Sequence, residues 1–182
     1  MITYEFANSP IFRSNKNYIE KIVDQLKSYI PRVDGYCSSF GFNIEIHFSK
    51  DNYSYLLKLH KHQSTQNGVV VPVDAFDFLK IELVISDLPA SQHFHVGKSA
   101  VRRLMTSSQL TEIFPAPYFA TFSDERLAQS IYPFVQENNI EEIALSKGIL
   151  TCMKFGKMEI TTFLSQAATV INLCCAPLSK VQ

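Results

Sequence analysis

Basic residues gather in one short stretch of the sequence, and their side chains could bind an anionic group. Eleven residues hold three cations and two imidazoles, namely His93, His95, Lys98, Arg102 and Arg103. An arginine can hold a carboxylate or a phosphate through two parallel hydrogen bonds, and a histidine can gain charge near neutral pH. We therefore predict these five residues as the ligand-binding site. A solvated basic edge that discourages strand aggregation would explain the same residues.

Two pairs of histidines have a spacing that could allow both side chains of a pair to bind one metal ion. His60 and His62, like His93 and His95, are separated by one residue, which places both imidazoles of a pair on one face of a strand. This spacing resembles the start of the metal site of the cupin family, in which a glutamate follows after three or four intervening residues. Other residues occupy those positions: Gln66, Asn67, Ser99 and Ala100. We therefore predict no metal and no cofactor, with the histidines on a polar sheet face or a loop.

The remaining motifs do not form a catalytic site. Residues 96–99, VGKS, end like a phosphate-binding loop, but Gln92 stands where the first glycine of G-x-x-x-x-G-K-[ST] belongs. The sequence contains no G-x-S-x-G turn and no H-E-x-x-H helix, and its four cysteines lie in no catalytic signature. Glu141 and Glu142 are only neighbours in sequence. Enzymatic activity is left open, but these absences favour a protein without it.

Composition indicates one ordered domain. The chain has 182 residues, of which 46% are hydrophobic and 19% charged, so we predict a single α+β domain over residues 1–182. Seventeen basic residues balance seventeen acidic ones, which disfavours nucleic acid and an anionic membrane surface as partners. The first five residues lack the features of a signal peptide, and no apolar run is long enough to span a bilayer. We therefore expect a cytoplasmic protein without a membrane partner.

The first half of the chain predicts one helix and a strand hairpin. Apolar residues recur at helical spacing over residues 15–30, and Pro31 ends the pattern. Strict alternation over residues 40–48 and 53–59 predicts two antiparallel strands with one buried face. We pair Phe48 with Tyr53, which places Ile46 by Tyr55, Ile44 by Leu57 and Phe42 by Leu59. Residues 79–85 should add a third strand to the same sheet.

The second half predicts shorter elements and a long final helix. Residues 69–73 contain Pro72 and allow only an edge strand or an extended connection, and we expect an irregular connection over residues 106–117. Ser123 should cap a helix that Pro133 kinks or restarts. The other predicted elements are a short extended segment at 93–96, a strand at 118–122, a hairpin of 142–145 with 149–155, and a helix at 157–175. This order favours an antiparallel sheet with helices packed on one face.

Two functions fit this reading. The first is a non-catalytic binding or protein-interaction module, because the elements are well specified and no catalytic group of residues accompanies them. The alternative is a helix-grip-like pocket protein that binds or acts on a small apolar ligand, since fourteen Phe and eight Tyr could line a cavity. An enclosed volume between sheet and final helix would favour the alternative. A filled interior would favour the binding module.

Overall fold

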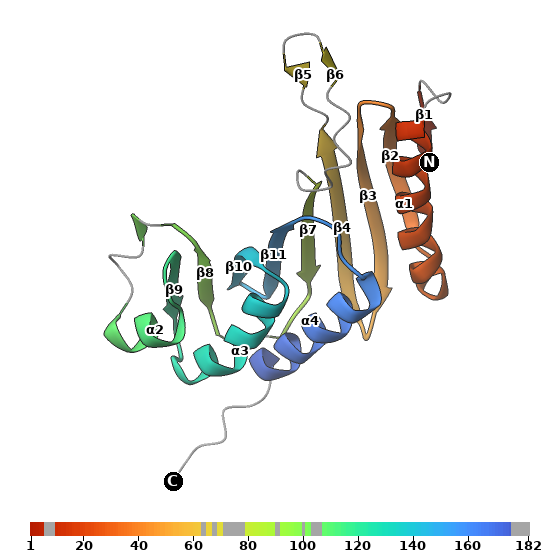
Figure 1. The fold of residues 1–182 in the computed structure, drawn as a ribbon. Helices are drawn as coiled ribbons and strands as arrows, with labels where there is room; N and C mark the ends of the chain where they lie inside the picture. Colours follow the sequence, from red (N-terminus) through yellow and green to blue (C-terminus); the bar gives the residue numbers. More distant parts are fainter. Residues whose placement is uncertain are drawn as a thin grey trace.

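One largely antiparallel sheet forms the body of the molecule (Figure 1). The computed structural model describes residues 1–5, 10–62, 65–66, 69–70, 79–89, 92–99, 101–102 and 107–175, and the side chains of 62, 65, 66, 69, 70 and 108 are not described. Within these residues nine strands join in one sheet. In spatial order they are β1 (Ile2–Tyr4), β2 (Arg32–Ser38), β3 (Gly41–Lys50), β4 (Tyr53–His62), β7 (Leu79–Ser86), β11 (Ile149–Phe155), β10 (Ile140–Ser146), β8 (Phe94–Lys98) and β9 (Tyr118–Phe122).

The helices lie on one face of this sheet (Figure 1). They are α1 (Pro10–Leu26), which continues into the 3₁₀ turn η1 (Lys27–Tyr29), α2 (Ser108–Ile113), α3 (Arg126–Glu137) and α4 (Ile160–Cys175). β1 pairs with β2 in parallel and the other neighbours pair antiparallel. The short strands β5 (Thr65–Gln66) and β6 (Val69–Val70) form a separate pair. The predicted α+β class, with a long C-terminal helix, is confirmed.

The core lies between the sheet and the helices. Alternation along β7 buries Leu79, Ile81, Leu83 and Ile85 to at most 1% exposure and leaves the residues between them on the other face. Phe163 of α4 is equally buried from the helix side. A ligand-sized cavity would leave accessible surface on its lining side chains, so these side chains fill the space around them. The opposite face of the sheet carries polar side chains such as Lys58 and Glu82 together with apolar ones such as Leu56 and Val84.

The first hairpin has the predicted faces but a different register. Phe48 pairs with Tyr55 and Ile46 with Leu57, so the predicted pairing of Phe48 with Tyr53 was wrong by two residues. Asp51 and Asn52 have φ values of 52° and 67° and form a two-residue turn, which makes Lys50 and Tyr53 partners.

A two-residue shift exchanges the partners but keeps every side chain on its face. The buried residues were therefore predicted correctly: Phe42, Ile44, Ile46, Leu57 and Leu59 are 0% exposed. Phe40 is different, because it lies in the turn before β3 and is 49% exposed.

Three helix predictions also need correction. α1 begins at Pro10 and ends at Leu26, and Ile30, expected on its buried face, adopts a left-handed φ of 52° and is 89% exposed. The connection predicted to be irregular contains α2, whose first turn is capped by the Ser107 hydroxyl accepting from the Leu110 amide. Ser123 caps no helix, because its hydroxyl accepts a hydrogen bond from the His93 amide instead.

The other predicted strands and helices lie where the sequence pattern placed them, with ends that differ by up to three residues. β9 occupies the predicted residues, and β10 and β11 join through Lys147 and Gly148, which have φ values of 51° and 71°. α3 runs through Pro133 without a restart. Of the edge strand predicted at residues 69–73, the structure shows β6 (Val69–Val70). The other predicted residues, 71–73, lie outside the described residues. No helix within the described part of the chain has both the length and the apolar character needed to cross a bilayer.

Candidate functional site

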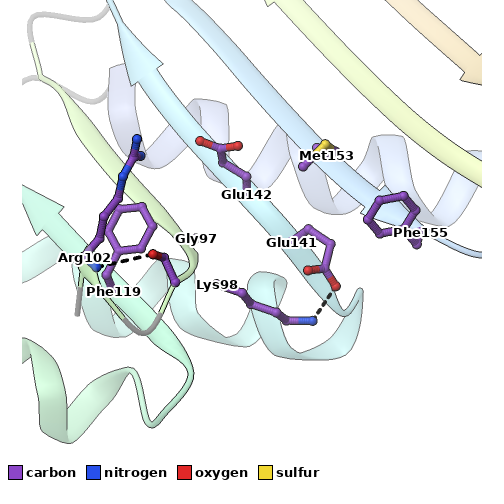
Figure 2. A pocket seen from close by; sticks show the side chains of 9 residues that line it. Gly97, Lys98, Arg102, Phe119, Glu141, Glu142, Met153 and Phe155 are labelled. Atoms are coloured by element: carbon purple, nitrogen blue, oxygen red, sulfur yellow. Dashed lines mark hydrogen bonds and ion pairs between the residues drawn. The ribbon is translucent and has the colours of Figure 1, made fainter.

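A pocket of about 390 Å³ lies on the open face of the sheet, opposite the helices. It is formed by the strands β9, β8, β10 and β11 together with the residues after β8 (Figure 2). The residues that line it are Gly97, Lys98, Ser99, Arg102, Phe119, Glu141, Glu142, Met153 and Phe155. The lining therefore combines two cations, two carboxylates and three large apolar side chains.

The floor of the pocket depends on a glycine that faces an aromatic ring. Gly97 pairs with Phe119 across β8 and β9, and a Cβ at Gly97 would lie 2.9 Å from Cε1 of that ring. The absence of a side chain thus lets the Phe119 ring lie against the strand. Two basic side chains contact the same ring. His95 meets it edge-on with ring centres 4.8 Å apart, and the Arg102 guanidinium lies 5.5 Å from the ring centre.

A β-bulge brings two consecutive glutamates to the pocket. Ile140 pairs with Lys154 and Glu142 with Met153, so Glu141 is an extra residue in β10. In a regular strand adjacent side chains point to opposite faces, but a bulge can redirect one of them. Glu141 and Glu142 both line the pocket as a result.

Each glutamate is paired with one of the predicted basic residues. The Lys98 ammonium lies 2.6 Å from Oε1 of Glu141 (Figure 2). It also donates to Oδ1 of Asn139 at 2.8 Å. Nε2 of His95 lies 2.6 Å from Oε1 of Glu142. The side chains of Lys98 and Glu141 are 23% and 24% exposed, so this pair is partly shielded from water. The charge of Lys98 is therefore balanced by the protein itself.

Arg102 differs from these residues because its guanidinium has no carboxylate partner within the described part of the chain. The backbone amide of Arg102 donates to the Ser99 hydroxyl at 3.3 Å. This hydrogen bond ties Arg102 to the residue that follows β8. The side chain is exposed at the pocket and lies over Phe119. Among the lining residues it is the cation that remains available to a ligand.

The structure brings together only part of the predicted site. Lys98 and Arg102 line the pocket, and His95 lies beside it against Phe119. His93 is exposed and lines none of the three hollows described here. Arg103 lies outside the described residues. The use of these residues for ligand binding stays a prediction.

Sequence reasoning missed the acidic and apolar half of the pocket. Glu141 and Glu142 were dismissed as sequence neighbours, because nothing in the sequence indicated the bulge. Phe119 was expected only as part of a strand, and Met153 and Phe155 as part of a hairpin. Alternation along β11 gave no signal for Met153 and Phe155, because the sequence favours them as the buried set, whereas the structure buries Cys152 and Lys154 instead.

The described histidines do not form a metal site in this structure. Within the described residues no group of three or more His, Cys, Asp and Glu side chains stands close enough to hold a metal ion. His95 is engaged by Glu142, and the side chain of His62 is not described. The predicted absence of metal remains open to experiment.

Three of the four cysteines are poorly suited to nucleophilic chemistry. Burial raises the pKa of the Cys37 thiol to about 11 and that of Cys174 to about 12, and it also raises the pKa of Cys152. A thiol is nucleophilic as the thiolate, and these groups stay protonated at neutral pH. None of the three therefore provides an activated nucleophile.

Two further hollows are less suited to a ligand. One of about 240 Å³ adjoins the pocket, shares Glu142 and Met153 with it, and contains the ion pair of Lys80 with Glu82 at 3.4 Å. The other, of about 410 Å³, lies between α2 and α3. Its one cation, Arg126, already forms several hydrogen bonds with the Asp124 carboxylate, which raise the pKa of Arg126 and lower that of Asp124.

Comparisons of the chain with models of known protein families, with curated proteins and with solved structures found no match. The function must therefore be inferred from the pocket itself.

Proposed function

We propose that the protein is a non-catalytic binding module that holds an anionic group of its ligand in the pocket on the open face of the sheet. The observation that carries this proposal is the position of Arg102, whose guanidinium lies over Phe119 without a described carboxylate partner. Lys98 and His95, the other basic residues at this place, are paired with Glu141 and Glu142. A carboxylate or phosphate could accept two hydrogen bonds from Arg102.

Binding without catalysis is supported by what surrounds Arg102. His95 lies beside the pocket with its ring against Phe119 and one nitrogen engaged by Glu142, and no cysteine is among the described residues that line the pocket. The lining charges balance, which argues against a nucleic-acid backbone as partner, because such partners require an excess of cations. A cytoplasmic location is part of the proposal on the sequence grounds given above.

The filled interior supports the open-face site over the helix-grip-like alternative. An apolar ligand held between the sheet and α4 would contact side chains such as Ile44, Leu57 and Phe163. These three are at most 1% exposed and already pack in the same core. A ligand there would have to displace core side chains, and no observation favours that second function.

A binding screen tests the proposal. Anionic metabolites and acidic peptides would be titrated into the wild type, an Arg102→Ala, Arg103→Ala double variant and an Arg13→Ala control, which removes an exposed arginine on α1. We expect at least one ligand whose affinity falls about tenfold or more in the double variant, falls further as salt rises, and is unchanged in the control. Ligands that bind all three proteins equally, without salt dependence, would contradict the proposal.

A further inference from the structure

We propose that the ligand of this pocket is a zwitterion of the size of a dipeptide, with its carboxylate on Arg102 and its ammonium group on Glu142. This inference rests on the proposed function and deepens it, since an anion on Arg102 alone would satisfy that function. The distinguishing feature is the presence of an available cation and an available carboxylate in the lining of one pocket.

Glu142 retains capacity for a ligand although it contacts His95. His95 engages only Oε1, and Oε2 has no hydrogen bond from the described residues. A carboxylate offers about four acceptor positions, so an ammonium group can be added without displacing the imidazole. The side chain is 46% exposed and lines the same pocket as Arg102 (Figure 2). Glu141 is less available, because Lys98 already occupies it.

The two charged groups are not paired with each other. Glu142 pairs with Gly97, and Gly97 pairs with Phe119, under the Arg102 guanidinium. Because neighbouring strands are about 4.8 Å apart, Glu142 and Phe119 are separated by roughly 10 Å between Cα atoms. Arg102 and Glu142 form no ion pair. A molecule with opposite charges at its two ends can bridge that gap, whereas a simple anion leaves Glu142 uncompensated beside it.

The pocket has an apolar side chain next to each of the two charged groups. The Phe119 ring lies against Gly97 and adjoins the Arg102 guanidinium, so the pocket has an aromatic surface beside its available cation. Met153, the partner of Glu142 on β11, adds a second apolar side chain on the far side of Glu142. A dipeptide with free termini meets these requirements, because one peptide unit separates its charges and its side chains can contact the two apolar residues.

Three forms of one dipeptide give a matched test. Alanylleucine carries both charges, N-acetyl-alanylleucine lacks the cation and alanylleucinamide lacks the anion. In calorimetric titrations of the wild type, we expect each capped form to bind at least about tenfold more weakly than the free dipeptide. The Arg102→Ala variant lacks the partner of the ligand carboxylate, so it should bind the free dipeptide and the amide alike. The Glu142→Gln variant lacks the partner of the ligand ammonium group, so it should bind the free and acetylated dipeptides alike.

A control variant and a stability check keep the test decisive. Glu45→Gln changes a glutamate on the same sheet face that also lies near a histidine, with its carboxylate 3.7 Å from His47, and this variant should bind all three forms as the wild type does. Melting temperatures would establish whether Glu142→Gln is folded. If it is not, the affinities of the wild-type protein for the three ligands test the proposal by themselves. Equal wild-type affinity for the free and acetylated dipeptides, with dependence on Arg102, would overturn the zwitterion and leave the proposed function standing. No binding of the free dipeptide at millimolar concentration would also overturn it.

Discussion

Replacing Ile44 with alanine tests whether the helix-side face of the sheet is the core. Ile44 lies in β3 between Gly35 of β2 and Leu59 of β4, and it is 0% exposed. The change removes three buried carbon groups, which at about 0.8 kcal/mol each account for roughly 2.5 kcal/mol. A residual cavity adds to this loss, because hydrogen-bonded strands on both sides limit how far the backbone can close in. We expect a loss of about 3 to 4 kcal/mol in unfolding free energy.

Urea unfolding followed by far-ultraviolet circular dichroism would measure this loss. Asn43→Ala provides the matched control, since Asn43 is the preceding residue of the same strand and is exposed on the other face. Its effect should stay within about 0.5 kcal/mol. A loss below about 1 kcal/mol for Ile44→Ala would refute the assignment of this face to the core.

Three further experiments have defined outcomes. The purified protein should carry no stoichiometric zinc by elemental analysis; one zinc per chain, lost when His93 and His95 are both changed to alanine, would contradict this. Glu159 accepts hydrogen bonds from the first turn of α4, which lower its pKa to about 2 from 4.5, so the stability it confers is complete above pH 4.5 and is lost as the pH falls towards 2. The stability difference between wild type and Glu159→Gln should accordingly shrink over that range in acid titrations of unfolding, and a constant difference would exclude this role. Gly97→Ala should push the Phe119 ring away and weaken ligand binding in calorimetry, whereas unchanged affinity would show that the ring does not shape the pocket.

The fold was predictable where it depends on periodicity. The faces of β3 and β4 follow from alternation alone, because alternation fixes which side chains share a face. The register additionally depends on turn geometry, and the left-handed residues Asp51 and Asn52 shortened the turn by two residues. α2 was missed because Pro115 and Pro117 follow it closely and its own six residues are too few for a helical pattern to stand out.

The site was predictable only in its basic half. Lys98 and Arg102 are close in sequence, so their proximity needed no knowledge of the fold. Glu141 reaches Lys98 across 43 positions of sequence, and it does so because a bulge in β10 redirects its side chain. Neither the pairing of β8 with β10 nor the bulge has a local sequence signal. The neutralisation of Lys98, which leaves Arg102 as the available cation, therefore came from the structure.

The most direct test of the central proposal is to map where a ligand binds. Amide chemical shifts of the labelled protein would be followed by nuclear magnetic resonance during titration with the tightest ligand from the binding screen. We expect the largest changes at the open-face pocket, in Gly97, Ser99 and Arg102. Changes centred instead on the core contacts between the sheet and α4, at Ile44 and Phe163, with the pocket unaffected, would contradict a binding site on the open face.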